Sequence, residues 1–167
     1  MPIHIISFQG GPPAQAPLSF HPLPPVLIAV GPVVSVLVEV PSALAAALQS
    51  AGSSIPQPAS GLALIDTGAT RSAVDDGVIQ ALGVQPTGVV NVGTAAGMQQ
   101  QSVYSARFTF PGSKLPTIEF AQLTGVNLRG HVVPHVNVPL IALIGRDLLS
   151  RFIMVYNGPH ATVTLAY

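Results

Sequence analysis

The carboxylate of Asp66, with Thr67 and Gly68 directly after it, is the clearest candidate for chemistry in this sequence. The apolar run 61–65 before it is typical of a buried strand, and Asp-Thr-Gly-Ala at its end delivers one acid to the start of a tight turn. Gly68 has no Cβ, so another group can approach the backbone closely there. The structural alternative is a strand that ends in an Asx turn and does no chemistry.

A second apolar run, 139–144, is followed directly by Gly145. Like the first run, it is typical of an apolar strand that leads to a glycine. Arg146 and Asp147 follow it, and residues 146–151 are predicted to form a short helix. The sequence contains no second Asp-Thr-Gly and no repeat of domain size. One chain therefore offers a single acid of this kind.

Residues 89–94 and 99–110, which lie between the two runs, are predicted to form the strands of a long hairpin. The tip of this hairpin consists of Ala95, Ala96, Gly97 and Met98. Such a tip has little to pack, which is what a lid that opens requires.

The composition favours an all-β fold, because 17 prolines and 16 glycines with three Tyr and no Trp suit a chain of many short strands. Further strands are predicted at 33–40, 117–123, 152–157 and 161–166, the last two as a closing hairpin. One short helix is predicted at 42–49 with Ser42 as its N-cap. Another is predicted at 77–82, with Asp75 and Asp76 as acidic caps rather than catalytic groups.

Charges are few and balanced. The sequence contains six basic and six acidic residues, and charged residues make up 7% of a chain that is 49% hydrophobic. This balance gives no attraction to nucleic acid or to an anionic membrane surface. So few charges on so apolar a chain favour an oligomer, in which more surface is buried than one subunit can bury. The absence of cysteine excludes disulfides and thiolate metal sites. No signal peptide or transmembrane helix is evident, and although the compartment stays open, a cytoplasmic location is favoured.

Three segments together resemble the retropepsins, the retroviral-type aspartic proteases that have single-domain relatives in bacteria and eukaryotes. They are residues 63–69 (Ala-Leu-Ile-Asp-Thr-Gly-Ala), the glycine-bearing hairpin, and residues 142–149 (Ala-Leu-Ile-Gly-Arg-Asp-Leu-Leu). Each motif is short, but their order and combination are specific, and the resemblance covers residues 61–167.

The resemblance implies an all-β acid-protease half-barrel with short helices, one lobe per chain, in a dimer. Residues 26–167 would form this single domain, preceded by an extended Pro/Gly-rich arm, 1–25, that begins with a weak strand. The domain would contain a catalytic turn at 63–70, a flap at about 89–108 and a closing strand and helix at 139–151.

The resemblance also implies roles for individual residues. Asp66 would be the catalytic acid, Thr67 would brace the two turns across the dimer, and Gly68 would give space and a carbonyl to the substrate. The implied substrate-binding residues are Ala69, Val92, Ala95, Ala96, Gly97, Met98 and Ile144. The implied supporting residues are Leu143, Gly145, Arg146 and Asp147.

One departure from the family concerns Arg146. Retroviral members usually place an acid where this chain has Thr70 or Arg71, and that acid pairs with the helix arginine. Arg146 must therefore bind backbone carbonyls or a different carboxylate, and its partner stays open.

Peptide hydrolysis without a metal or a nucleophilic side chain requires one group to take a proton from water and another to give one. Two carboxylates held close together cannot both ionise cheaply, so they share a proton and act as base and acid together. Asp75 and Asp76 are explained as caps, Asp147 begins a helix, and Glu39 and Glu119 lie in strand runs far from any glycine turn. One chain thus lacks a second acid, and a twofold homodimer would supply the second Asp66. The predicted function is a homodimeric aspartic endopeptidase that binds an extended polypeptide as an added strand.

Three alternatives compete with this function: a metal site, a serine hydrolase and a module that binds without catalysis. His131 and His135 have the spacing of a metal site, but Pro134 prevents a regular helix between them, so no metal or cofactor is predicted. No serine lies in a glycine-flanked elbow, which argues against a serine hydrolase. The third alternative is a catalytically silent retropepsin-like module for peptide binding or dimerisation. The intact Asp-Thr-Gly argues against it, because such a module has no need to keep two repelling charges together.

Overall fold

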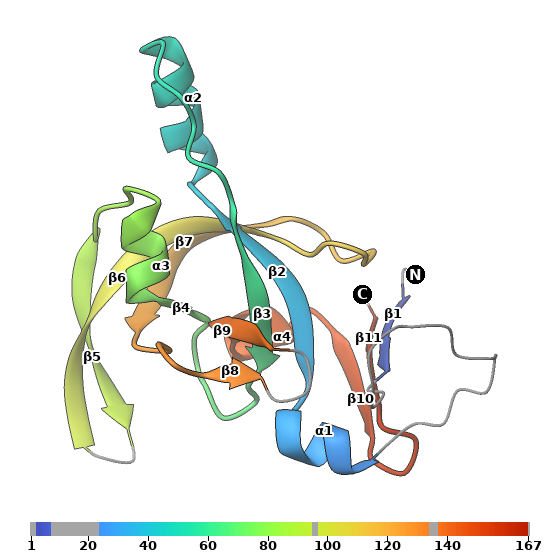
Figure 1. The fold of residues 1–167 in the computed structure, drawn as a ribbon. Helices are drawn as coiled ribbons and strands as arrows, with labels where there is room; N and C mark the ends of the chain where they lie inside the picture. The colour runs from blue at the N-terminus through green and yellow to red at the C-terminus, as the bar shows by residue number, and fades with distance from the viewer. Residues whose placement is uncertain (1–2, 8–23, 95–96, 134–136, 167) are drawn as a thin grey trace.

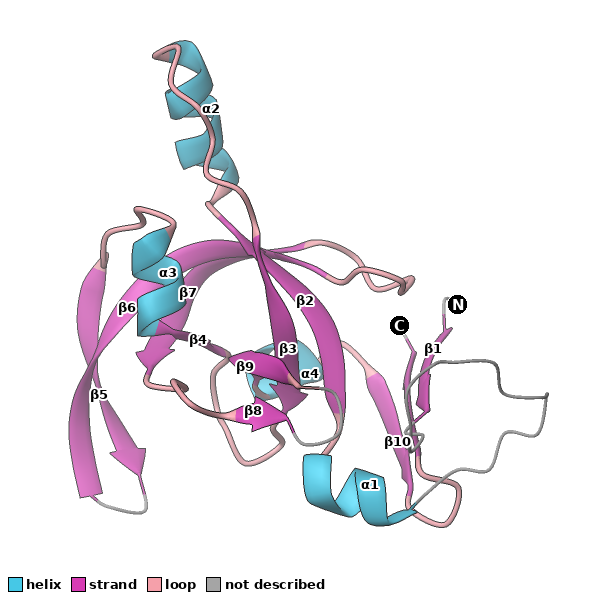
Figure 2. Ribbon diagram, viewed as in Figure 1, coloured by secondary structure: helices cyan, strands magenta, loops and turns pink. Residues whose placement is uncertain are grey.

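β-Strands dominate the fold, which is all-β with a few short helices (Figures 1 and 2). The structure is a computed structural model that describes residues 3–7, 24–94, 97–133 and 137–166. The strands described are β1 (Ile3–Ser7), β2 (Val33–Glu39), β3 (Ala59–Ile65), β4 (Ala73–Asp75), β5 (Gly88–Thr94), β6 (Gly97–Thr109), β7 (Ile118–Val126), β8 (Val132–Val133), β9 (Val138–Ile144), β10 (Ile153–Asn157) and β11 (Thr162–Ala166). The helices described are α1 (Pro24–Val30), α2 (Ser42–Ser50), α3 (Asp76–Ala81) and α4 (Arg146–Leu149).

Strands β2, β3, β9, β4, β7 and β6 pair in this order, and β6 pairs with β2, so the sheet closes into a six-stranded barrel. The all-β character expected from the sequence is therefore confirmed, in the form of a closed barrel. The closure depends on the length of β6, which pairs with β5 through its first half and with β2 through residues 107–109. The alternating side chains of β2 fill the interior, where Val36 and Val38 are fully buried.

Strands β1, β11 and β10 form a separate three-stranded sheet to which both ends of the described chain contribute (Figure 1). The expected N-terminal arm therefore begins with a paired strand, Ile3–Ser7, and it ends earlier than expected because helix α1 starts at Pro24. Prolines are tolerated in the first turn of a helix, and Gly31 ends this one with a φ of 74°. Residues 8–23 of the predicted arm lie outside the described residues.

Most of the predicted local elements are confirmed, with boundaries that shift by a few residues. The long hairpin forms from β5 and β6, and the closing hairpin from β10 and β11. Asp75 caps α3 as predicted, and its carboxylate accepts a hydrogen bond from the Val78 N–H at 3.0 Å.

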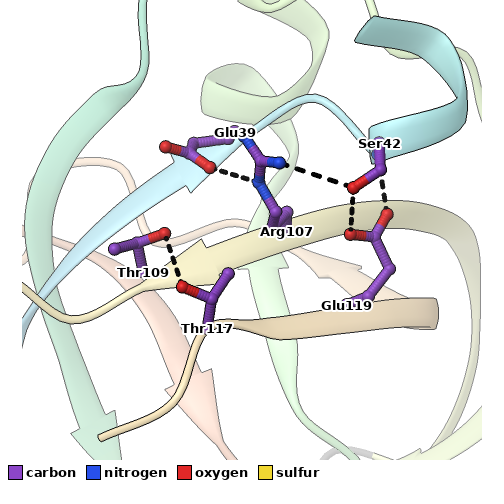
Figure 3. A network of polar contacts seen from close by, with 6 residues as sticks. All are labelled: Glu39, Ser42, Arg107, Thr109, Thr117 and Glu119. Atoms are coloured by element: carbon purple, nitrogen blue, oxygen red, sulfur yellow. Dashed lines mark hydrogen bonds and ion pairs between the residues drawn. The ribbon is translucent and has the colours of Figure 1, made fainter. Parts of the chain in front are cut away.

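The N-cap predicted for α2 is wrong, because Pro41 occupies that position and Ser42 is the first helical residue. Ser42 instead donates hydrogen bonds from its N–H and its Oγ to the carboxylate of Glu119 on β7, at 2.8 and 2.9 Å (Figure 3). Arg107 on β6 joins the same network through Glu39 and the Ser42 Oγ. This network anchors the base of α2, which projects away from the barrel (Figure 1).

Candidate active site

Asp66 lies directly after β3, a barrel strand that pairs with β2 on one side and with β9 on the other. β3 runs parallel to β9, with Ile65 opposite Ile144. The backbone N–H of Asp66 donates to the carbonyl of Ile144 at 2.9 Å, and the turn closes when the Ala69 N–H donates to the Asp66 carbonyl at 3.2 Å. Both contacts fix the backbone from which the Asp66 carboxylate projects.

The Asp66 carboxylate is oriented through one of its two oxygens. Oδ1 accepts hydrogen bonds from the N–H groups of Gly68 and Ala69, at 2.8 and 3.2 Å. No described residue donates a hydrogen bond to Oδ2. A Cβ on Gly68 would lie 3.1 Å from Oδ1, so the glycine makes room for the carboxylate of its own turn. The Asx turn and an available carboxylate oxygen therefore exist together.

Gly145, at the end of β9, lies against the backbone that follows this turn. A Cβ on Gly145 would lie 2.5 Å from the Arg71 carbonyl oxygen and 2.7 Å from the Ser72 nitrogen. Real Cβ atoms do not approach backbone atoms so closely, so only glycine permits this packing. The contact joins the end of β9 to the backbone that leaves the Asp66 turn.

Arg146, the first residue of α4, binds the Asp66 turn without any carboxylate. Its Nη1 donates to the carbonyl oxygens of Thr67 and Gly68 at 2.9 and 3.3 Å, and its Nη2 donates to the Thr70 hydroxyl at 3.0 Å. The carbonyls of the turn are therefore the partner of Arg146 that the sequence left open. The Gly68 carbonyl, expected to face the substrate, is engaged by this arginine.

Asp147 and the fully buried Ser72 form a second brace, in which Asp147 was expected as a supporting residue and Ser72 was missed. The Asp147 carboxylate accepts from the Ser72 N–H at 2.9 Å and from its Oγ at 2.7 Å. The Ser72 Oγ in turn accepts from the Gly145 N–H at 3.1 Å. A serine after an exposed arginine gives no local signal of this role, which depends on residues more than 70 positions away.

A cleft of about 630 Å³ lies between the Asp66 turn and the β5–β6 hairpin. Its described lining consists of Asp66, Gly68, Ala69, Thr70, Arg71, Ala73, Val90, Asn91, Val92, Gly93, Gln101, Thr124, Val126 and Leu143. Val90 to Gly93 are four consecutive residues of β5. Because side chains alternate along a strand, four consecutive lining residues mean that the β5 backbone itself borders the cleft.

The cleft brings together some of the predicted site residues and not others. Asp66, Gly68, Ala69 and Val92 line it, together with Leu143, which was expected only to support the turn. Ile144, predicted to line a substrate pocket, is instead 2% exposed in the core, because neighbouring residues of β9 face opposite ways.

The other predicted residues lie outside the cleft lining. Thr67 is exposed on the turn, and Gly97 and Met98 are exposed on the hairpin. Ala95 and Ala96 lie outside the described residues.

Asp66 and Arg71 are the two ionisable residues in the described lining, so the cleft of one chain contains a single carboxylate. Asp75 and Asp147 are engaged as structural acceptors elsewhere. The described lining also contains Gln101, whose Oε1 is buried and has no hydrogen-bond partner there. An acceptor in this state costs free energy until a donor reaches it.

The described part of the chain contains no group of three or more His, Asp or Glu side chains placed to bind a metal ion. His135, half of the pair considered for a metal site, lies outside the described residues, while His131 is exposed. None of the helices that the structure describes has the length and apolarity to cross a bilayer. In comparison with known proteins, no protein-family model matches the chain, and no curated protein is recognisably similar to it.

Proposed function

We propose that this chain is an aspartic endopeptidase that cuts extended polypeptides as a homodimer, with the Asp66 side chains of two subunits as its catalytic pair. The observation that carries the proposal is the state of the Asp66 carboxylate. It lines a cleft, its Oδ1 is fixed by two backbone N–H groups, and its Oδ2 receives no hydrogen bond from the residues described. A fixed acid with one available oxygen is what proton transfer to and from water requires.

The second acid of the pair comes from the partner subunit in this proposal. Two Asp66 carboxylates close together share one proton. The ionised carboxylate takes a proton from water, whose oxygen attacks the peptide carbonyl carbon, while the protonated carboxylate gives its proton to the carbonyl oxygen. The carboxylate that took the water proton then gives it to the amide nitrogen, a hydroxyl of the tetrahedral intermediate gives its proton to the other carboxylate, and the C–N bond breaks to release acid and amine. The braces from Arg146 and Asp147 support this chemistry because they keep the turn in one conformation.

The substrate is an extended peptide that lies between the Asp66 turn and the β5–β6 hairpin. β5 is the last strand of its sheet and pairs on one side with β6, so its other edge is open among the described strands. The β5 backbone borders the cleft, and an extended peptide can pair with such an edge through main-chain hydrogen bonds. Val90, Val92 and Leu143 supply apolar contacts for its side chains.

The direct test replaces Asp66 with Asn, which keeps the shape and removes the charge. Wild-type protein is expected to cleave a peptide library at acidic to neutral pH, whereas Asp66→Asn loses turnover by at least about 10³-fold, because the acid–base pair is gone. The Asn side-chain oxygen still accepts the turn's N–H bonds, so the thermal midpoint and the dimer are expected to persist.

The matched control is Asp76→Asn, the same change at a carboxylate outside the cleft lining. Its turnover is expected to equal that of wild type. Equal turnover, or none, in wild type and Asp66→Asn would favour the silent peptide-binding or dimerisation module over a protease.

A further inference from the structure

Arg71 stands in the lining of the Asp66 cleft without a carboxylate partner. Its Nη1 donates to the side-chain oxygen of Gln122 on β7 at 2.6 Å, and this partner is neutral. Arg71 takes no part in the ion pair that joins Arg107 to Glu39. The positive charge of Arg71 therefore reaches the cleft without being neutralised by another side chain.

The acids of the chain are committed to other partners or lie elsewhere, which is why none compensates Arg71. Their contacts are those of Glu39 with Arg107, Glu119 with Ser42, Asp147 with Ser72, Asp75 with the Val78 and Leu128 N–H groups, and Asp66 with its own turn. Asp76 lies in the first turn of α3, outside the cleft lining. A substrate carboxylate would thus meet an arginine whose described side-chain partner is the neutral Gln122.

The geometry of a guanidinium adds specificity to this charge. Arginine carries five N–H donors in a planar fork that matches the two oxygens of a carboxylate. The bond to Gln122 uses one donor and fixes one edge of the fork. The remaining donors suit a bidentate contact with an acidic side chain, which is stronger than a neutral hydrogen bond.

The rest of the cleft limits where such an acidic side chain can bind. Next to the Asp66 pair, another carboxylate would be repelled by like charge. Because Arg71 lines the same cleft but follows the Asp66 turn in the sequence, we expect its contact to fall at a peptide position away from the scissile bond. In a twofold dimer, the second Arg71 occupies the equivalent place on the other side of the scissile bond.

We propose that Arg71 makes this cleft selective for peptides with an acidic side chain away from the scissile bond, at positions on either side of it. This inference rests on the proposed protease function and names its substrate class. The neutral polar residues around Arg71, among them Thr70 and Thr124, supply no opposing charge.

The experiment compares pairs of peptides that differ only in Glu against Gln, with the acidic residue moved from four positions before the cleaved bond to four after it. Wild type is expected to favour Glu in kcat/KM by about tenfold, the scale of a charge-assisted hydrogen bond. The preference is expected to peak at one position on each side and to shrink as salt is raised. Arg71→Gln is expected to abolish it, and Arg71→Glu to replace it with a preference for Lys.

Arg129→Gln is the matched control, since Arg129 lies outside the cleft lining, and it is expected to keep the wild-type preference. Affinity of the Glu and Gln peptides for Asp66→Asn protein, measured by fluorescence anisotropy, tests selectivity without turnover. If wild type cuts peptides but treats Glu and Gln alike, or if Arg71→Gln keeps the preference, the inference fails while the protease stands. If no cleavage depends on Asp66 but the Glu peptide still binds more tightly through Arg71, the protease fails and the acidic-peptide specificity stands.

Discussion

At the scale of single residues, the Asp66 turn depends on neighbours that perform no chemistry. Arg146 binds two of its carbonyls, and Ser72 connects Asp147 to the Gly145 N–H. Gly145 has the strictest requirement, because the Arg71–Ser72 peptide occupies the space where a side chain would begin. The position of Asp66 therefore rests on close backbone packing as much as on hydrogen bonds.

Gly145→Ala is expected to lower the free energy of unfolding by about 3 kcal/mol, because its Cβ must displace the backbone at Arg71 and Ser72. Chemical denaturation measures the loss. Gly88→Ala is the control, since a Cβ at Gly88 meets no atom within 4 Å, and its effect is expected to stay within about 0.5 kcal/mol. Equal stability of the two variants would show that the β9–turn contact is not tight.

The sequence predicted the Asp66 turn but not the distant contacts that hold it, because only the turn is made of consecutive residues. The strand, the acid and the glycine of the Asp66 turn are local and leave a clear pattern in consecutive residues. Thr70 and Arg71 stand at the positions where an acid was expected to pair with Arg146. The sequence therefore limited the partner of Arg146 to backbone carbonyls or a different carboxylate. The bond of Ser72 to Asp147 and the place of Gln101 in the cleft lining depend on residues that the fold brings together. No local sequence pattern could have predicted them.

At the scale of elements, α2 and the Asp66 turn lie at opposite ends of β3. None of the residues of α2 is buried, and the helix extends beyond the barrel (Figure 1). Its attachment comes from Glu119, which accepts two hydrogen bonds at the first residue of the helix (Figure 3). A carboxylate at a helix N-terminus also interacts favourably with the helix dipole.

Glu119→Ala is expected to destabilise α2 by about 1 kcal/mol, because the first helical N–H loses its acceptor. Hydrogen exchange is expected to speed up in residues 42–50 but not in the barrel strands, and peptide cleavage is expected to persist. Thr117→Ala, which removes only a 3.5 Å contact with Thr109 on the same surface, is the control and is expected to leave exchange unchanged. Unchanged exchange in Glu119→Ala would show that the network does not hold the helix.

The same scale shows which elements a sequence can predict. Strand β2, the β5–β6 hairpin and the Asp75 cap follow from alternation, turn residues and capping within a few positions. Helix α1 was missed because Pro24 and Pro25 were interpreted as part of an extended arm, although both fit a first helical turn. Closure of the barrel was missed because β2 and β6 pair across about seventy positions, as at Glu39 and Arg107.

At the scale of the whole molecule, the proposal requires two chains. The cleft of one chain contains one carboxylate among its described lining residues, whereas the chemistry needs two. Thr67 is exposed beside that acid. The edge strand β10 exposes Ile153, Val155 and Tyr156, and exposed apolar edge strands are prone to pair with another chain. Each feature supports self-association, and the proposed catalytic site would belong to the dimer and not to one chain.

The most direct measurement of this claim is the binding stoichiometry of a statine-type transition-state mimic, determined by isothermal titration calorimetry at a chain concentration where the mass in solution is that of a dimer. A site shared by two chains predicts one inhibitor bound for every two chains, and loss of this binding in Asp66→Asn. One inhibitor bound per chain, or binding that survives in Asp66→Asn, would contradict a site made from two copies of Asp66.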